Sequence, residues 1–311
     1  MSLGAQLHAL LPAPVFTPLL RSGYQLVAGA PLETFEFLQS PFSAWHTVES
    51  MAVLYLALVA LLRLLHNTLE IKHTLRPYFK PFFIVHNAFL SVFSLVLFVV
   101  LLENIAPVLL KEGIFFALCS PTMYTKELQV IYYLNYLTKY FEFIDTLFLV
   151  ANGSKLEFLH WYHHSMTMLL CYVQIIGKPS VQWVPILLNL LVHFVMYYYY
   201  ALAALNIRVW WKQWITTLQI IQFVVDLAAV YYATYYAAFD LWRPLVPASL
   251  AASLSIPETN EHQCTGTPFA AGFGCALLTS YLALFIRFFI QTYLSKPAAG
   301  KGKGAVKPKT E

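Results

Sequence analysis

Charged residues are scarce in this sequence. Only 11% of its 311 residues are Asp, Glu, Lys or Arg, and 59% are hydrophobic, whereas a soluble domain carries about 25% charged residues. A chain of this composition cannot cover itself with a surface compatible with water, which excludes a soluble globular protein. The net charge of +4 lies mostly in a basic tail and in short loops, so it gives no indication of a nucleic-acid partner.

Three further features are missing. The apolar runs are continuous and lack the alternation of polar and apolar residues that a transmembrane β-barrel requires. Residues 1–46 are interrupted by prolines and contain no short apolar core, so no cleavable signal peptide is expected. No internal repeat is visible. A helical membrane protein is the class that remains.

Seven stretches are long and apolar enough to span a bilayer, for which about 17–25 residues are needed. They lie near residues 47–66, 81–103, 128–150, 158–177, 181–204, 214–238 and 268–294. The sequence therefore predicts an all-α polytopic membrane protein with seven transmembrane helices. We divide it into an N-terminal segment (1–46), a membrane domain (47–294) and a basic tail (295–311), whose composition predicts disorder.

The distribution of lysine and arginine predicts the orientation of the chain. Of the 19 Lys and Arg residues, Lys139 and Arg287 fall inside spans, and five fall on one side of the membrane. The other twelve fall in the tail and in or at the edge of the loops after the first, third and fifth spans, with Arg63 at the end of the first span counted among them. Because positively charged loops stay in the cytosol, we expect a cytosolic C-terminus and an N-terminus on the other side of the membrane.

Polar groups inside the spans indicate where function should be sought. The third span contains Lys139, Glu142 and Asp145, and one charged side chain at the membrane centre costs about 2.5–3.5 kcal/mol. These three groups are therefore expected to face inward and to pair. One interpretation is a purely structural network of buried ion pairs, and the other is a reaction site.

Two more spans carry polar stripes at helical spacing. The stripe on the fifth span consists of Asn189, His193, Tyr197 and Tyr200. The stripe on the sixth span consists of Gln219, Gln222 and Asp226. A Tyr-rich helix end is also typical of an interfacial aromatic belt, but that reading does not explain the deeper Asn189 and His193.

The fourth span begins with "HWYHH" (160–164), which places His160, His163 and His164 on one helix face. A di-iron oxygenase or desaturase would need further histidine boxes, and none is present. A zinc hydrolase would need a glutamate within the box. The chain thus has fewer ligands than these metal sites need, and we expect no metal.

The alternative role for the histidine box is covalent catalysis, because a neutral imidazole is a competent nucleophile toward a thioester. Cys171 is a rival nucleophile, although a cysteine in an apolar span is ordinarily inert.

Four motifs in order carry a resemblance over about residues 40–295. They read "KYFEFIDT" (139–146), "HWYHH" (160–164), "HFVMYYYY" (193–200) and "TTLQIIQ" (216–222). They are similar to the K-x-x-E-x-x-D-T, histidine-box, H-x-x-M-Y-x-Y-Y and T-x-x-Q-x-x-Q motifs of the ELO family of very-long-chain fatty acid elongases. The chain resembles most the branch of that family found in fungi.

The resemblance implies a multi-pass condensing enzyme (a 3-oxoacyl-CoA synthase) of the endoplasmic reticulum membrane, with a lumenal N-terminus, that supplies precursors for sphingolipids. It would join a long-chain acyl-CoA to malonyl-CoA and release 3-oxoacyl-CoA, carbon dioxide and CoA, without a cofactor. It also implies that six of the seven helices enclose a tunnel for the acyl chain. Expected partners are the lipid bilayer and the reductases and dehydratase of the elongation cycle, whereas a homo-oligomer is left open.

The resemblance also implies residue roles. His163 would take the acyl group and His193 would face it, while His160 and His164 would orient them together with Asp145 and Glu142. The remaining polar residues expected to support the reaction are Lys139, Asn189, Tyr197, Tyr200, Gln219 and Gln222. From topology alone, the residues expected to bind CoA phosphates at the cytosolic mouth are Lys72, Arg76, Lys155, Arg208 and Lys212.

Two expectations concern the lumen and the tail. Cys119 and Cys264 fall on the same non-cytosolic side, where an oxidising compartment favours a disulfide between them. Cys171 and Cys275 lie within spans.

The chain ends in "KPKTE", in which Lys307 and Lys309 resemble a dilysine-type retrieval signal, with a solvated basic tail as the alternative. Acyl chain length and unsaturation are left open.

Overall fold

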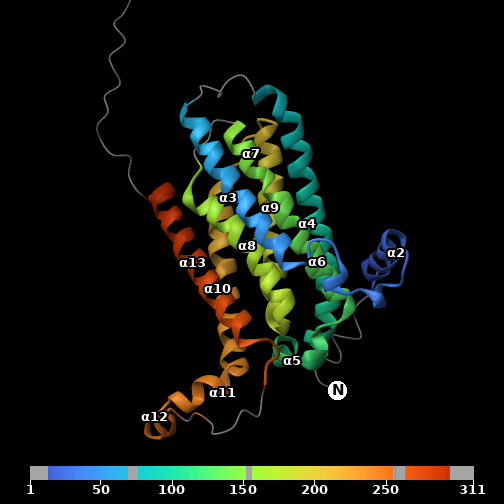
Figure 1. The fold of residues 1–311 in the computed structure, drawn as a ribbon, viewed down its shortest axis with the longest axis vertical. Coiled ribbons are helices and arrows are strands. Elements are labelled where there is room, and N and C mark those ends of the chain that lie inside the picture. Colours follow the sequence, from blue (N-terminus) through green and yellow to red (C-terminus); the bar gives the residue numbers. More distant parts are fainter. Residues whose placement is uncertain (1–12, 69–75, 152–155, 255, 257–262, 295–311) are drawn as a thin grey trace, which may run out of the picture.

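A computed structural model describes residues 13–68, 76–151, 156–254, 256 and 263–294 (Figure 1). In these ranges the chain is helical and contains no β-strand. The expected tail (295–311), including Lys307 and Lys309, lies outside the described residues.

Five helices in the described ranges are long and apolar enough to cross a membrane, which confirms an all-α polytopic membrane protein. They are α3 (Trp45–Thr68), α4 (Arg76–Glu112), α9 (Trp183–Ala204), α10 (Lys212–Ala237) and α13 (Pro268–Phe289). The two other expected spans correspond to α6 (Lys126–Glu142) with α7 (Ile144–Ala151), and to α8 (Phe158–Gly177). Helices α6 and α7, with 17 and 8 residues, are each too short to cross a membrane alone, and α8 carries the polar histidine box. The count of seven spans therefore stays a prediction.

Six helices close into a ring. Contacts run from α4 to α9, α10, α13, α8 and α6, and from α6 back to α4. Helix α3 stands outside this ring and contacts α8 and α7. Since α6, α8, α9 and α10 carry the polar stripes, closing the ring turns these stripes toward a shared interior. This arrangement agrees with the expectation that six helices enclose a tunnel.

Helix α4 is longer than the expected span 81–103. Its 37 residues correspond to about 56 Å, well beyond the bilayer thickness of about 30 Å. The additional turns contact the N-terminal segment. The carboxylate of Glu103 accepts hydrogen bonds from the backbone N–H groups of Val15, Phe16 and Thr17, which are the groups left unpaired where α2 (Phe16–Ala28) begins.

One end of the bundle is covered by short elements, which Figure 1 shows gathered at its lower end. These elements are α5 (Ile114–Cys119), η4 (Pro121–Met123), η5 (Ser180–Gln182), α11 (Phe239–Trp242), η6 (Arg243–Leu245) and α12 (Ala248–Ser253). The N-terminal segment adds η1 (Leu32–Thr34) and η2 (Phe37–Gln39), and α13 continues into η7 (Ile290–Leu294), a π-helical turn.

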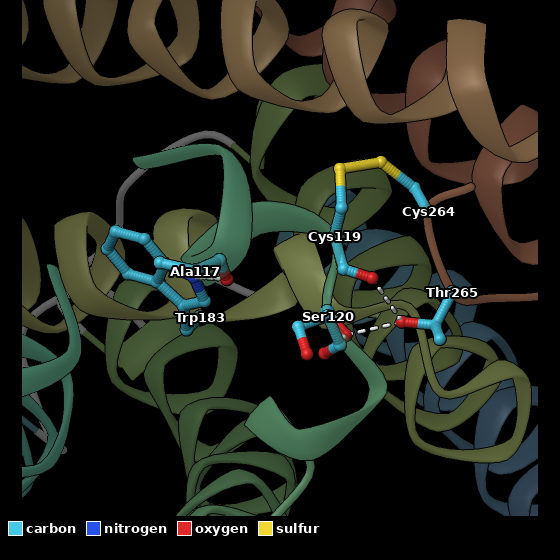
Figure 2. Close-up of a disulfide and its surroundings, with 7 residues drawn as sticks. Ala117, Cys119, Ser120, Trp183, Cys264 and Thr265 are labelled. Carbon is cyan, nitrogen blue, oxygen red and sulfur yellow. Dashed lines mark hydrogen bonds between the residues drawn. A yellow bond between two sulfur atoms is a disulfide. The ribbon is translucent and has the colours of Figure 1, made fainter. Parts of the chain in front are cut away.

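A disulfide joins Cys119 to Cys264 at this end (Figure 2). The backbone N–H of Thr265 donates to the carbonyl of Cys119 at 3.0 Å, and the indole N–H of Trp183 donates to the carbonyl of Ala117 at 2.8 Å. The bridge is the pair expected from topology, and it holds the loops before α6 and α13 together. The two free cysteines, Cys171 and Cys275, lie in α8 and α13.

Candidate active site

Two cavities meet inside the ring. The outer chamber, of about 430 Å³, reaches the exposed residues Glu157 and Lys212, so it opens to the surface. The inner chamber, of about 80 Å³, extends toward the disulfide end and stops at buried residues. The residues that line both chambers are His163, Asn189, Gln222 and Phe223. A molecule bound across this junction would have one end in each chamber.

A buried ion pair stands beside the junction. Lys139 and Glu142, one turn apart on α6, are 2% and 1% exposed, and their Nζ and Oε1 atoms are 2.8 Å apart. The same ammonium donates to Asn189 Oδ1 at 2.9 Å. Desolvation makes an unpaired charge very unfavourable here, so Lys139 and Glu142 depend on each other, and Asn189 ties them to α9.

The carboxylate of Glu142 also faces two imidazoles. Its Oε1 lies 3.2 Å from His193 Nδ1, and its Oε2 lies 3.8 Å from His164 Nδ1. A carboxylate can only accept, so the closer contact favours the His193 tautomer with the proton on Nδ1 and leaves Nε2 of that ring as the basic nitrogen. The contact with His164 is longer than a hydrogen bond and is electrostatic. Glu142 thereby orients histidines from α8 and α9 around one charge.

The histidine box lies on the wall of the outer chamber, as its spacing predicts. The rings of His160 and His164 contact each other with centroids 4.4 Å apart. His163 projects to the junction, where its ring lies 4.9 Å from that of Tyr281 on α13. Thus His163 alone among the three borders both chambers.

His160 is oriented by a chain of hydroxyl groups. Its Nε2 lies 3.0 Å from Thr146 Oγ1, and the hydroxyl of Tyr55 lies 2.8 Å from the same Thr146 oxygen. Tyr55 belongs to α3, outside the ring, so this helix also contributes to the site. Sequence reasoning did not single out Tyr55, because its neighbours in the first span are apolar.

Asp145 contacts a different histidine from the one expected. Its Oδ1 lies 2.8 Å from His86 Nε2 on α4, and its Oδ2 accepts from the Tyr197 hydroxyl at 2.8 Å. The hydrogen bonds of Asp145 therefore go to His86 and Tyr197, whereas Glu142 faces the catalytic candidates. Sequence reasoning assigned no role to His86. A single histidine at membrane depth was the signal that could have identified it.

The other predicted polar residues divide between the chambers. Tyr200 and Gln219 line the outer chamber, and the Gln219 amide lies 3.6 Å from Met196 Sδ. Gln222 borders both chambers and donates to Asp226 Oδ2 at 3.1 Å. Cys171 lines the inner chamber, where its sulfur lies 3.8 Å from Asn135 Nδ2.

The expected CoA-binding residues are only partly within the described chain. Lys212 is exposed and lines the mouth of the outer chamber. Arg208 is exposed but does not line it. Lys72 and Lys155, and the side chain of Arg76 at the start of α4, lie outside the described residues.

Among the residues that the structure describes, no three His, Cys, Asp or Glu side chains form a cluster that could hold a metal ion. The carboxylate of Glu142 faces Nδ1 of His164 and His193, and Nε2 of His160 faces a threonine hydroxyl. His160, His163, His164 and His193 thus contact a hydroxyl group, a carboxylate and other rings of the protein, an environment that suits imidazoles that transfer protons or act as nucleophiles.

Comparison with known proteins gives the family. A family model described as ELO: GNS1/SUR4 family matches residues 40–301. The chain belongs to this family. Two Schizosaccharomyces pombe proteins designated fatty acid elongases 1 and 2 are 40% and 38% identical to it, over 85% and 87% of this chain and 75% and 70% of their own lengths. Fatty acid elongase A of Dictyostelium discoideum is 34% identical over 82% of this chain and 83% of its own length.

The fission yeast relatives support the fungal-type branch of the ELO family that the motifs indicate. The four motifs of this ELO protein lie on α6 and α7, α8, α9 and α10, and each contributes at least one residue to the outer chamber. Segments far apart in the sequence thus build one site.

Proposed function

We propose that this chain is a fatty acid elongase of the condensing type, a 3-oxoacyl-CoA synthase that joins an acyl-CoA to malonyl-CoA. The observation that carries the proposal is the position of His163 at the junction of the two chambers. A thioester at this point has its acyl chain in the inner chamber and its CoA part in the outer chamber, which opens to the surface.

In the first step, a ring nitrogen of His163 attacks the thioester carbonyl. The new bond joins nitrogen to the acyl carbon, and the carbon–sulfur bond breaks, so that CoA leaves as a thiolate and takes up the proton released by the imidazole. The adjacent His164, whose Nδ1 lies 3.8 Å from Glu142, can carry this proton. The product is an acyl-imidazole on His163.

In the second step, malonyl-CoA loses carbon dioxide and its enolate attacks the acyl carbon. The new carbon–carbon bond forms as the nitrogen–carbon bond breaks, which leaves 3-oxoacyl-CoA. The released ring nitrogen takes up one proton from solvent through the open outer chamber, which returns neutral His163. Negative charge develops on two oxygens during this step, and preorganised donors lower the barrier. The Asn189 amide lines the outer chamber, where its N–H groups can act as such donors, and the basic Nε2 of His193 on the same wall can transfer a proton.

The same proposal places the protein in the membrane of the endoplasmic reticulum, with its N-terminus in the lumen and its C-terminus in the cytosol. The Cys119–Cys264 disulfide supports this orientation, because its end of the bundle then faces an oxidising compartment. The mouth at Lys212 then faces the cytosol, where it can meet the phosphates of CoA. The reductases and dehydratase of the elongation cycle would use the product.

The test is to incubate membranes containing the protein with malonyl-CoA and a series of saturated and unsaturated acyl-CoAs. We expect 3-oxoacyl-CoA products two carbons longer than the acyl substrate, and carbon dioxide in equal amount. Membranes with His163→Ala should give neither. Products that form without malonyl-CoA, or full activity of His163→Ala, would contradict the proposal.

A further inference from the structure

Among the described residues, three buried side-chain oxygen atoms on the wall of the inner chamber accept no hydrogen bond: Oδ1 of Asp226, Oδ1 of Asn135 and, in η5 at the disulfide end, Oε1 of Gln182. The first two lie nearest the junction. Asp226 is 0% exposed. Its Oδ2 accepts from Gln222, whereas its Oδ1 has no partner among the described residues. Asn135 is 2% exposed, and its Oδ1 also has no partner in the described part of the chain. Both side chains line the chamber, whose other walls are largely apolar.

These two residues lie at the same depth. Asp226 follows Gln222 by four residues on α10, and Asn135 precedes Lys139 by four residues on α6. Gln222 borders both chambers, and Lys139 bonds Asn189, which also borders both. Each acceptor is therefore one helical turn, about 6 Å, deeper than the junction. Because α6 and α10 are not neighbours in the ring, they face the chamber from different sides.

An acyl chain that enters the inner chamber must pass between these oxygens. A methylene group at this depth would keep water from both acceptors without offering a hydrogen bond, which is unfavourable. A hydroxyl group would donate to one of them. The carboxylate of Asp226 and the amide of Asn135 thus provide a binding site for a hydrogen-bond donor within a chamber that otherwise suits alkyl chains.

We propose that Asp226, assisted by Asn135, makes the inner chamber selective for acyl chains that carry a hydroxyl group one helical turn inside the junction. The inference rests on the proposed function, because it needs the acyl chain to lie in the inner chamber. The selected hydroxyl lies part-way along the chain: the carbonyl end is held at His163, and the far end lies deeper, near Ile175 and Val181.

The experiment uses monohydroxylated acyl-CoAs of one chain length, with the hydroxyl moved stepwise along the chain, and the unsubstituted acyl-CoA as reference. For the full-length protein in membranes, we expect the ratio of kcat/KM for hydroxylated over unsubstituted substrate to peak at one internal position. Asp226→Val removes the acceptor and should lower the ratio at that position about tenfold, with little change at the other positions.

Two further variants separate hydrogen bonding from shape. Asp226→Asn keeps an acceptor oxygen, so it should retain most of the peak and also shows that substitution at this site is tolerated. Leu278→Val changes the wall of the same chamber without touching a polar atom, so it should leave the position of the peak unchanged.

The outcomes also distinguish the inference from the proposed function. Failure of the wild type to elongate any acyl-CoA would contradict the proposed function. Normal elongation of the unsubstituted chain with a flat ratio at every position would overturn only the inference, and would mean that water satisfies the two oxygens. An unchanged peak in Asp226→Val would overturn it as well.

Discussion

The two ends of the ring are built in opposite ways. At the disulfide end, Cys119 is bonded to Cys264 and the adjoining backbone is hydrogen-bonded, so the inner chamber stops at buried side chains. At the other end, the outer chamber widens to exposed Lys212 and Glu157. The difference shows how one ring can hold an apolar chain at its closed end while its open end admits a charged, water-soluble group.

The ionisable side chains are also distributed unequally between the open end and the closed end of the ring. Lys139, Glu142 and the histidines of α8 and α9 gather around the junction, where Glu142 faces Lys139, His164 and His193. Beyond the junction, Asp226 is the only carboxylate in the described part of the chain that lines the inner chamber. The comparison predicts that substitutions on the open side act on turnover, whereas those on the closed side act on stability or on chain selection.

The largest effect is expected at Glu142. Glu142→Gln keeps the shape but removes the charge that orients His164 and His193, and it leaves the Lys139 ammonium without a counter-ion. We expect kcat to fall by a factor on the order of 10² to 10³, measured as product formation per unit of folded protein. Glu157→Gln, at the exposed rim of the same chamber, is the matched control, and an equal loss there would contradict the assignment.

The second effect concerns the closed end. Replacing Cys119 and Cys264 by serine opens a cross-link between residues 145 apart, which the chain-entropy treatment values at up to about 4–5 kcal/mol. We expect a clear drop in the thermal unfolding midpoint in detergent, with kcat at low temperature nearly unchanged. A reductant should destabilise the wild type in the same way and leave the double variant unaffected. Loss of turnover without loss of stability would contradict the division between the two ends.

A smaller effect on turnover is expected at His86. His86→Ala removes one of the two partners of Asp145, whose carboxylate lines the outer chamber and is then held by Tyr197 alone. We expect kcat to fall about tenfold, in line with the loss of one buried hydrogen bond to a charged group. His86→Gln, which can still donate to Asp145, should recover part of the rate. Equal rates for the two variants would show that the hydrogen bond to Asp145 is not what matters.

The smallest effect is expected at the mouth. Lys212→Ala should raise KM for both CoA substrates by a few-fold, since an exposed charge contributes about 0–1 kcal/mol, and the difference should shrink at high ionic strength. Lys111→Ala, at the closed end and also exposed, provides the control. An equal rise of KM in both variants would contradict CoA binding at Lys212.

Much of this arrangement could be predicted from sequence, for identifiable reasons. The steps of three and four residues from Asn189 to Tyr200, and from Gln219 to Asp226, fix which helix faces are polar, and the structure turns both faces inward. Cys119 and Cys264 could be paired because topology places them on one side. Helix periodicity decides which helix faces are polar, and the order of the spans decides the cysteine pair.

Other features depend on how helices are rotated against one another, which no single helix encodes. The contact of Lys139 with Asn189, and the division of labour between Glu142 and Asp145, required the ring to be closed. The span expected at 128–150 is interrupted at Phe143, between α6 and α7. Tyr55 is an isolated polar group in an apolar helix, so no periodic pattern marks it. His86 lies beside Asn87, Ser91 and Ser94, which are uncharged and did not draw attention to this helix.

The central claim is that His163 carries the acyl group, and covalent trapping tests it most directly. The purified protein is incubated with a long-chain acyl-CoA in the absence of malonyl-CoA, and its peptides are analysed by mass spectrometry. We predict an acyl adduct on His163 in the wild type, released when malonyl-CoA is added, and no adduct in His163→Ala. An adduct on Cys171, or one on His163 that malonyl-CoA does not release, would contradict the account.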